Sequence, residues 1–228
     1  QVLSAKVLRL ANSPFYGFPS RIASVAHAVV VLGLNVVKGL TLCATAFDMM
    51  RNAGMNELWR HSLGVAMTAH ILGTKAAMKN PEEVFVAGLL HDIGKVVLYV
   101  KWPDVGQQIT TVTRNTSRPL MDTEQELFEV THADVGGWLA SAWHLPTSLR
   151  EPILHHHTPA AAQDAKLQTA IVHVADVLVK GLACGNPGDD LVPPLSRQAW
   201  DLVGLDAQSL AHCLTQATEE FQTIDDYL

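Results

Sequence analysis

Histidines and aspartates recur at five widely separated places, each inside or beside an apolar, helix-like segment, and this pattern strongly constrains the fold. The places are His61, the pair His91–Asp92, His132, the run His155–His157, and Asp176. A buried polar group must find a partner, so we expect the segments that carry these residues to meet around one centre. Histidine and carboxylate are the side chains that hold Zn, Mn or Fe. The pattern therefore predicts helices folded around a single metal site.

The composition is that of a chain with a substantial core. Of its 228 residues, 48% are hydrophobic, which is enough to bury a large apolar interior. Strand-like alternation is hard to find, whereas helix-like spacing covers almost every segment. We therefore expect an all-α, multi-helix fold. The net charge of −6, with scattered basic residues, argues against a nucleic-acid binder that uses a basic face.

The cysteines and the start of the chain suggest where the protein works. Cys43, Cys184 and Cys213 form no C-x-x-C pair, so we interpret them as reduced packing residues of a cytoplasmic protein, with a reactive thiol as the alternative. No signal peptide opens the chain, and the missing initial Met suggests a fragment. The apolar stretch Ala26–Phe47 contains polar residues that are costly in lipid, which favours a buried helix pair over a membrane span.

Capping signals divide the chain into expected helices. Ser24 and Gly33 bracket one helix, and a second runs from about 35 to 51. The break at Asn52–Gly54 is the expected boundary between an N-terminal helical lobe, residues 1–53, and a helical core, residues 54–228. In the core we expect helices over about 56–79, from 81 to the pair His91–Asp92 with Gly94 as its end, and over 147–157, 167–181, 195–204 and 207–222.

Two further segments have the spacing of a capping box. Thr123 and Glu126 predict one helix start, and Thr131 and Asp134 predict another, which would place His132 in the first helical turn. The positive end of a helix disfavours an imidazolium ion. We therefore expect the pKa of His132 to lie below the usual value of about 6.5, which leaves a neutral ligand.

The spacing of the ligands favours two ions over one. Neighbouring residues on a helix point about 100° apart, so His91 and Asp92 cannot face one ion in the same way. Both residues can act as ligands if His91 binds one ion and Asp92 bridges toward a second. The neighbours His156 and His157 would likewise face different directions. This favours a two-ion centre over a single tetrahedral structural Zn.

Each of these residues also has a purely local interpretation. Asp92 could pair with Lys95 at i+3, the histidine run could complement a helix C-terminus, and Asp176 could cap or pair locally. A lone histidine on a helix is more often a hydrogen-bonded core or surface residue than a ligand. On that ground five histidines are left out of the predicted site: His27, His70, His144, His173 and His212.

Several strings together resemble the HD superfamily of metal phosphohydrolases. They are Trp59–Ser62, His91–Lys95, His132–Gly136, His156–Pro159 and His173–Asp176. Further segments narrow the resemblance, over essentially the whole chain, to the HDOD family, the HD-related output domains of bacterial signalling: Leu3–Ser13, Ser24–Gly33 and Trp143–Pro146. The family's domain usually starts earlier, so we expect its first helices to be missing here.

The resemblance implies a ligand set but conflicting activities. In the related HD-GYP phosphodiesterases, which cleave cyclic dinucleotides, the position matching Lys95 lies near the substrate phosphate. The positions that bind the metals in those enzymes match His61, His91, Asp92, His132, His156, His157 and Asp176 of this sequence. The Gly-Tyr-Pro segment expected after the double histidine is absent, since the chain reads Thr158–Gln163 there. HDOD proteins are generally regarded as signalling modules without established catalysis.

Two functions therefore stay open at this stage. The favoured one is a bacterial signal-transduction module that acts through a signalling protein or an attached signalling domain, with contact surfaces at the loops Asn12–Ser20 and Asp189–Asp190. The alternative is a metal-dependent phosphohydrolase or phosphodiesterase for nucleotides or cyclic dinucleotides, with Asp92 and Lys95 as catalytic candidates. Either would use divalent cations, two of them in our interpretation, drawn from Fe, Mn, Zn or Mg, and neither involves a membrane.

Overall fold

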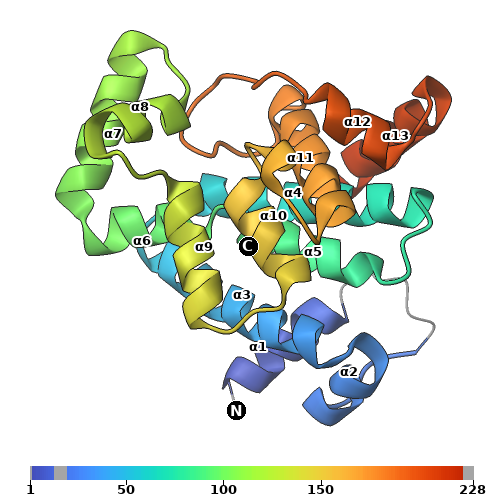
Figure 1. Cartoon of the computed structure of the whole chain (residues 1–228). Coiled ribbons are helices and arrows are strands. Elements are labelled where there is room, and N and C mark those ends of the chain that lie inside the picture. Colours follow the sequence, from blue (N-terminus) through green and yellow to red (C-terminus); the bar gives the residue numbers. More distant parts are fainter. Residues whose placement is uncertain (1, 13–19, 223–228) are drawn as a thin grey trace.

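The chain folds into helices without strands over the residues described by the computed structural model, 2–12 and 20–222 (Figure 1). The expected all-α class is thereby confirmed. The helices are α1 (Val2–Ala11), α2 (Val25–Leu32), α3 (Leu34–Asn52), α4 (Asn56–Lys75), α5 (Pro81–Leu90), α6 (Ile93–Lys101), α7 (Pro103–Thr116), α8 (Leu120–Phe128), α9 (His132–Ala142), α10 (Thr147–His155), the short 3-10 helix η2 (Pro159–Ala161), α11 (Lys166–Gly181), α12 (Arg197–Val203) and α13 (Ala207–Phe221).

Helix α4 is the buried axis of this arrangement. Nearly all of its residues from Leu58 to Gly73 are buried, as expected for a helix that is apolar on every side. It packs against α5, α11 and α13, and Figure 1 shows α4 and α5 passing through the middle of the bundle. His61, the predicted metal ligand on α4, therefore lies inside the protein.

The two central helices approach each other closely because α5 has a glycine at their contact. A Cβ atom at Gly88 would lie 2.7 Å from the Cα atom of Ala66 on α4, so only glycine allows the backbones to come this near. The contact brings His61 of α4 beside His91 at the end of α5, with ring centroids 5.3 Å apart. Helix packing thus assembles the first part of the site.

The N-terminal helices lie on one side of this pair. Helices α1 and α2 pack on α3, and α3 packs on α5 and α6. Ser24 caps α2 by accepting a hydrogen bond from the His27 backbone N–H, and Gly33 ends it with a φ of 83°, as predicted. Their buried side chains join the same hydrophobic cluster as the core helices, and a lobe boundary at residue 53 stays a prediction.

The predicted end of α5 at Gly94 is wrong. The helix ends at Leu90, His91 and Asp92 form a turn, and Gly94 lies in the first turn of α6. A Cβ atom at Gly94 would lie 1.9 Å from the backbone oxygen of His132 at the start of α9. The glycine therefore serves the close contact between α6 and α9, which is a long-range requirement.

Of the two capping boxes, one is confirmed and one is wrong. The Thr131 side chain accepts a hydrogen bond from the Asp134 backbone N–H, and the Asp134 side chain accepts one from the Thr131 backbone N–H. Helix α9 therefore begins at His132, as expected. Helix α8 already begins at Leu120, and Thr123 lies inside it, where its hydroxyl donates to the backbone oxygen of Pro119. Proline, with its fixed φ, is the residue before that helix.

The apolar stretch Ala26–Phe47 is divided between α2 and α3 by Gly33. Among the described residues, no helix has both the length and the apolar character needed to cross a lipid bilayer. Cys43, Cys184 and Cys213 form no disulfide within the described residues, and all three are buried, in keeping with the packing role expected of them.

Candidate metal centre

The seven predicted ligands meet at one place in the bundle although they are spread from α4 to α11. They are His61 on α4, His91 and Asp92 in the turn between α5 and α6, His132 at the first residue of α9, His156 and His157 directly after α10, and Asp176 on α11. All are buried except His157, which is partly exposed. Five segments remote in sequence thus converge, as the sequence pattern predicted.

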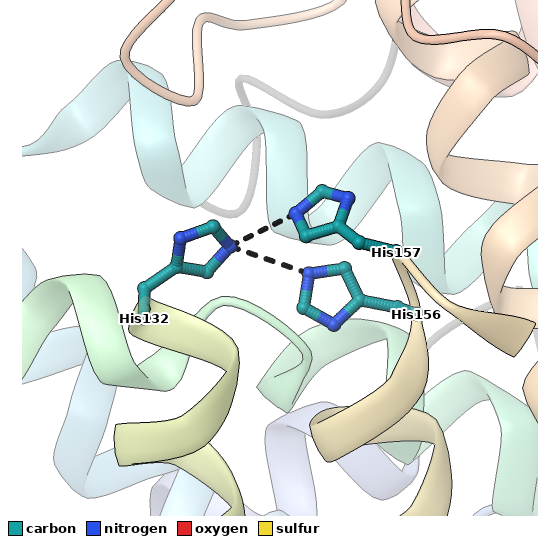
Figure 2. A group of neighbouring side chains, drawn as sticks. All are labelled: His132, His156 and His157. Carbon is teal, nitrogen blue, oxygen red and sulfur yellow. Dashed lines mark hydrogen bonds between the residues drawn. The ribbon is translucent and has the colours of Figure 1, made fainter. Parts of the chain in front are cut away.

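Three histidines form the first group of this centre. Figure 2 shows the His132 ring facing those of His156 and His157, with its Nε2 atom directed at both. The Nε2 atom of His132 lies 3.0 Å from Nε2 of His157 and 3.4 Å from Nε2 of His156. Three ring nitrogens in such proximity are a suitable donor set for one divalent cation, and the group has the spacing of a metal site.

Two histidines and two carboxylates form the second group. The Nε2 atom of His61 lies 3.0 Å from Oδ1 of Asp176 and 3.9 Å from Oδ2 of Asp92. The Nε2 atom of His91 lies 3.3 Å from the same Oδ2 atom. His61, His91 and Asp92 also have the spacing of a metal site, and Asp176 adds a further oxygen.

Asp92 lies between the two groups and turns one oxygen toward each. Its Oδ2 atom faces His61 and His91, while its Oδ1 atom lies 3.2 Å from Nε2 of His132 and 3.7 Å from Nε2 of His156. Burial would raise the pKa of Asp92, but His91 and Lys95 hold it well below its usual range. An ionised carboxylate so placed has the geometry of a bridge between two cations.

The orientation of the rings is fixed by oxygen atoms on their outer sides. Nδ1 of His91 lies 2.7 Å from the backbone oxygen of Gly88, and Nδ1 of His156 lies 2.9 Å from that of Ile153. A proton on each Nδ1 satisfies these contacts and leaves the Nε2 lone pair directed at the centre. Main-chain carbonyls thus select the tautomer that a metal ligand would require.

His132 is held by a residue that the sequence did not single out. Glu124 on α8 is fully buried, and its Oε2 atom accepts hydrogen bonds from the backbone N–H of His132 at 2.8 Å and from its Nδ1 at 2.6 Å. A carboxylate behind a ligating histidine orients the ring and raises its basicity. In the sequence, Glu124 stands among exposed acidic neighbours and carries no distinguishing signal.

The expected lowering of the His132 pKa is wrong. Burial acts to lower it, but the carboxylates of Glu124 and Asp92 outweigh burial and raise the pKa above its usual value. The helix end alone would lower the pKa of His132, but two negative charges from other elements face the ring. The neighbouring His157 behaves differently, since burial and the electrostatic effect of His132 lower its pKa to about 3.

His173 supports the centre from behind without facing it. Its Nδ1 lies 2.7 Å from the backbone oxygen of His156, and its Nε2 accepts a hydrogen bond from the Ser196 backbone N–H at 3.0 Å. Both contacts are satisfied by one neutral tautomer, and burial lowers the pKa of His173. Leaving His173 out of the ligand set agrees with this geometry, although it does position the backbone beside a predicted ligand.

Lys95 adds a buried positive charge at the edge of the centre. Its Nζ donates to Oδ2 of Asp92 at 2.7 Å, so the i+3 pair considered as a local alternative does form. Burial would lower the pKa of Lys95, but Asp92 raises it, and the ammonium persists. The pair coexists with the ligand cluster, because Asp92 has a second oxygen for the histidines.

Several buried polar atoms of the centre contact one another without forming a well-directed hydrogen bond, and this supports a bound cation. Within the described residues, both ring nitrogens of His61, Nε2 of His91 and Oδ1 of Asp92 have no hydrogen bond. Such groups are rare in folded proteins because each carries a desolvation cost. Imidazole nitrogens and carboxylate oxygens suit divalent transition metals, so the residues present fit the expected cofactor. Their role as ligands stays a prediction.

The two loops predicted as contact surfaces have different outcomes. Of the loop Asn12–Ser20, residues 13–19 lie outside the described residues. In the other loop, the Asp189 side chain turns inward: its oxygens accept hydrogen bonds from Lys180 at 2.9 Å and from the Leu120 backbone N–H at 2.9 Å. Only Asp190 is exposed there, so this loop presents less acidic surface than expected.

The sequence profile of the HDOD domain matches residues 1–159, which is most of the chain. The chain belongs to the HDOD family. The match includes α1 to α10, and thus every predicted ligand except Asp176. This match agrees with the family resemblance from which the metal ligands of this sequence were predicted.

Solved structures share the fold. An HDOD domain protein of unknown function from Geobacter sulfurreducens has a TM-score of 0.78 and 28% identity, covering 100% of this chain and 83% of that chain. A protein from Shewanella amazonensis, named as a candidate phosphohydrolase, has a TM-score of 0.65 and 25% identity, covering 94% of this chain and 78% of that chain.

A curated relative is longer than this chain. An uncharacterized protein of Treponema pallidum (strain Nichols) is 25% identical over 195 residues, which is 83% of this chain and 38% of that protein. This HDOD chain therefore spans well under half of that relative's length.

Proposed function

We propose that this chain is a bacterial signal-transduction module of the HDOD type, in which a two-cation His/Asp centre joins the helices and a protein partner or an attached signalling domain receives the signal. The observation that carries the proposal is the position of Asp92. One of its oxygens faces a group of three histidine nitrogens, and the other faces His61 and His91.

The arrangement of the centre supports a role for the cations in holding the fold together. When bound, divalent cations would draw the ligands together and offer a Lewis-acidic position to an oxyanion. The protein's own part is to fix the ligands: Gly88 and Ile153 orient two rings through their carbonyls, and Glu124 orients a third. Since the ligands come from five segments, occupancy is coupled to their packing, which a partner could sense.

A second function is favoured by one feature, the buried ammonium of Lys95 beside Asp92. A cation at this place could bind a phosphate oxygen and stabilise the charge that develops when a phosphoester is cleaved. The second candidate is therefore a metal-dependent phosphohydrolase or phosphodiesterase that acts on nucleotides or cyclic dinucleotides.

Elemental analysis of protein purified without chelator, combined with a turnover screen on nucleotides and cyclic dinucleotides, tests the proposal. We expect about two equivalents of divalent cation per chain and no turnover above that of the Lys95→Ala variant. If the parent protein shows turnover and Lys95→Ala does not, the result would contradict the regulatory role and support the hydrolase. A chain purified without any bound cation would contradict the two-cation centre.

A further inference from the structure

The segment that joins α11 to α12, residues 185–196, contains no helix or strand, and we call it the strap. Figure 1 shows it in orange, extending from α11 toward α8 before it returns to α12. Its large apolar side chains, Leu191, Val192 and Leu195, are exposed, so burial of apolar surface contributes little to holding it in place. The order of the strap therefore depends on polar contacts at a few places along it.

The start of the strap lies directly against the predicted ligand His61. Gly185 has a φ of +71°, and a Cβ atom there would lie 2.4 Å from the backbone nitrogen of His61, so only glycine permits this approach. The next residue, Asn186, donates its backbone N–H to the Glu57 carbonyl at 3.2 Å, one helical turn before His61. This end of the strap thus follows the position of a ligand in the second group.

The end of the strap is connected to the predicted ligand His156 through His173. The backbone N–H of Ser196 donates to Nε2 of His173 at 3.0 Å. Because that nitrogen accepts, the ring proton lies on Nδ1, which donates to the backbone oxygen of His156 at 2.7 Å. His173 is buried, so water competes little for these two hydrogen bonds. This end of the strap thus follows a ligand of the first group.

Asp189 fastens the middle of the strap to α8 and α11. Its oxygens accept hydrogen bonds from Nζ of Lys180 and from the Leu120 backbone N–H, both at 2.9 Å. Lys180 stands one helical turn after the predicted ligand Asp176 on α11. Burial would raise the pKa of Asp189, but Lys180 holds it below its usual value. The ion pair is mostly buried, so removal of one partner leaves a poorly solvated charge.

Pro193 and Pro194 limit the slack between the last two contacts. Each ring fixes one φ angle near about −65°, and consecutive prolines favour an extended, semi-rigid chain. The stretch from Asp189 to Ser196 therefore cannot absorb a displacement of either end by coiling. A shift of the His156 backbone would be passed along the strap.

We propose that the strap is the conformational output of the centre: cation binding orders it, and cation loss loosens it. The basis is the contact of its two ends with the backbone of His61 and, through His173, with that of His156, which belong to different groups of predicted ligands. Cations that fix the distance between the groups would also fix the ends of the strap. This inference rests on the proposed function, and it names the element through which occupancy of the centre would be passed on.

Hydrogen exchange followed by mass spectrometry tests the inference on protein freed of metal by a chelator and then titrated with Mn²⁺ alone. We expect Mn²⁺ to slow the exchange of strap amides, among them those of Asn186 and Ser196, by about fivefold or more, the lower end of typical coupling between sites. The turn between α4 and α5, residues 76–80, is the internal control. It lies at the end of α4 remote from His61 and at the end of α5 remote from His91, so its exchange should not change.

Loosening the strap at its middle should in turn weaken the centre, because coupling between two sites is reciprocal. Asp189→Asn removes the ion pair with Lys180 without altering a predicted ligand. We expect faster exchange of the strap and an Mn²⁺ affinity lower by about fivefold or more, measured by competition with a fluorescent chelator. Asp190→Asn is the matched control, since it removes the charge of the next residue, whose contact with the Asn186 side chain an asparagine oxygen can keep. Its Mn²⁺ affinity should equal the parent's.

A second variant loosens the strap at its start and covers the case in which Asp189→Asn does not fold. Gly185→Ala should push the strap away from α4 and speed exchange at its other end, the Ser196 amide. Gly54→Ala is the matched control, because Gly54 has nearly the same φ, +72°, but no atom within 4 Å of the added carbon. Both variants share the strain of a left-handed alanine, so a difference between them reports the contact with α4.

Cation content, measured on the same samples, separates this inference from the proposed function. Protein that binds Mn²⁺ without slower exchange in the strap, or with equal slowing in residues 76–80, overturns the inference and leaves the centre in place. An unchanged Mn²⁺ affinity in a variant whose strap exchanges faster does the same, as does equal Ser196 exchange in Gly185→Ala and Gly54→Ala. Protein that binds no Mn²⁺ contradicts the centre and the inference together.

Discussion

At the scale of residues, the atoms behind the predicted ligands decide which ring nitrogens could bind a cation. A histidine becomes a metal ligand only when its inward nitrogen lacks a proton, and this is set by what the other nitrogen contacts. Two rings are oriented by main-chain carbonyls, which no side-chain substitution can remove. His132 alone among these three depends on a side chain, Glu124. The affinity of the centre should therefore respond strongly to that glutamate.

Replacing Glu124 by glutamine tests this dependence. Glu124→Gln keeps the shape but removes the charge that makes His132 more basic, so we expect cation affinity to fall about tenfold or more, as for other carboxylates behind ligands. Competition with a fluorescent chelator measures the affinity. Glu126→Gln, which changes an exposed ion pair on the same helix, is the matched control. Equal affinity of the two variants would show that Glu124 does not tune His132.

At the scale of elements, the close approach of helices places the ligands. The turn between α5 and α6 presents His91 and Asp92, and its position depends on how near α6 comes to α9. Gly94 is the contact residue, since a side chain there would overlap the backbone of His132. One glycine therefore sets the distance between two segments that carry predicted ligands.

Gly94→Ala should accordingly destabilise the protein. A methyl group would force α6 away from α9, and overpacking of this kind costs about 3 kcal/mol in free energy of unfolding. Urea denaturation of the chelator-treated protein measures this without a contribution from metal. Gly181→Ala, at the end of α11 with no atom within 4 Å of the added carbon, is the control and should be neutral. Similar midpoints for both variants would argue against a close α6–α9 contact.

At the scale of the whole molecule, local signals in the sequence predicted what local interactions determine. The cap at Ser24 and the capping box at Thr131 and Asp134 were predicted because the partners lie within a few residues. The convergence of the histidines was also predicted, since apolar helices have few other ways to satisfy buried imidazoles and the family resemblance pointed to the same residues.

Long-range contacts explain what the sequence could not predict. The role of Glu124 and the raised pKa of His132 both arise where α8 meets the start of α9. Gly94 resembles a helix end in the sequence, because its close neighbour across the α6–α9 contact, the His132 backbone, lies far away along the chain. The contact of His173 with the His156 backbone depends on the segment before α12, which the sequence around His173 does not reveal.

The position of Asp92 between the two groups of predicted ligands is the feature on which the proposed centre depends. The most direct test is the cation content of Asp92→Ala, measured by elemental analysis beside the parent and beside Asp122→Ala, an exposed aspartate on α8. We predict that Asp92→Ala loses at least about one equivalent of divalent cation per chain, while Asp122→Ala retains the parent's content. Unchanged cation content in Asp92→Ala would contradict the bridged two-cation centre.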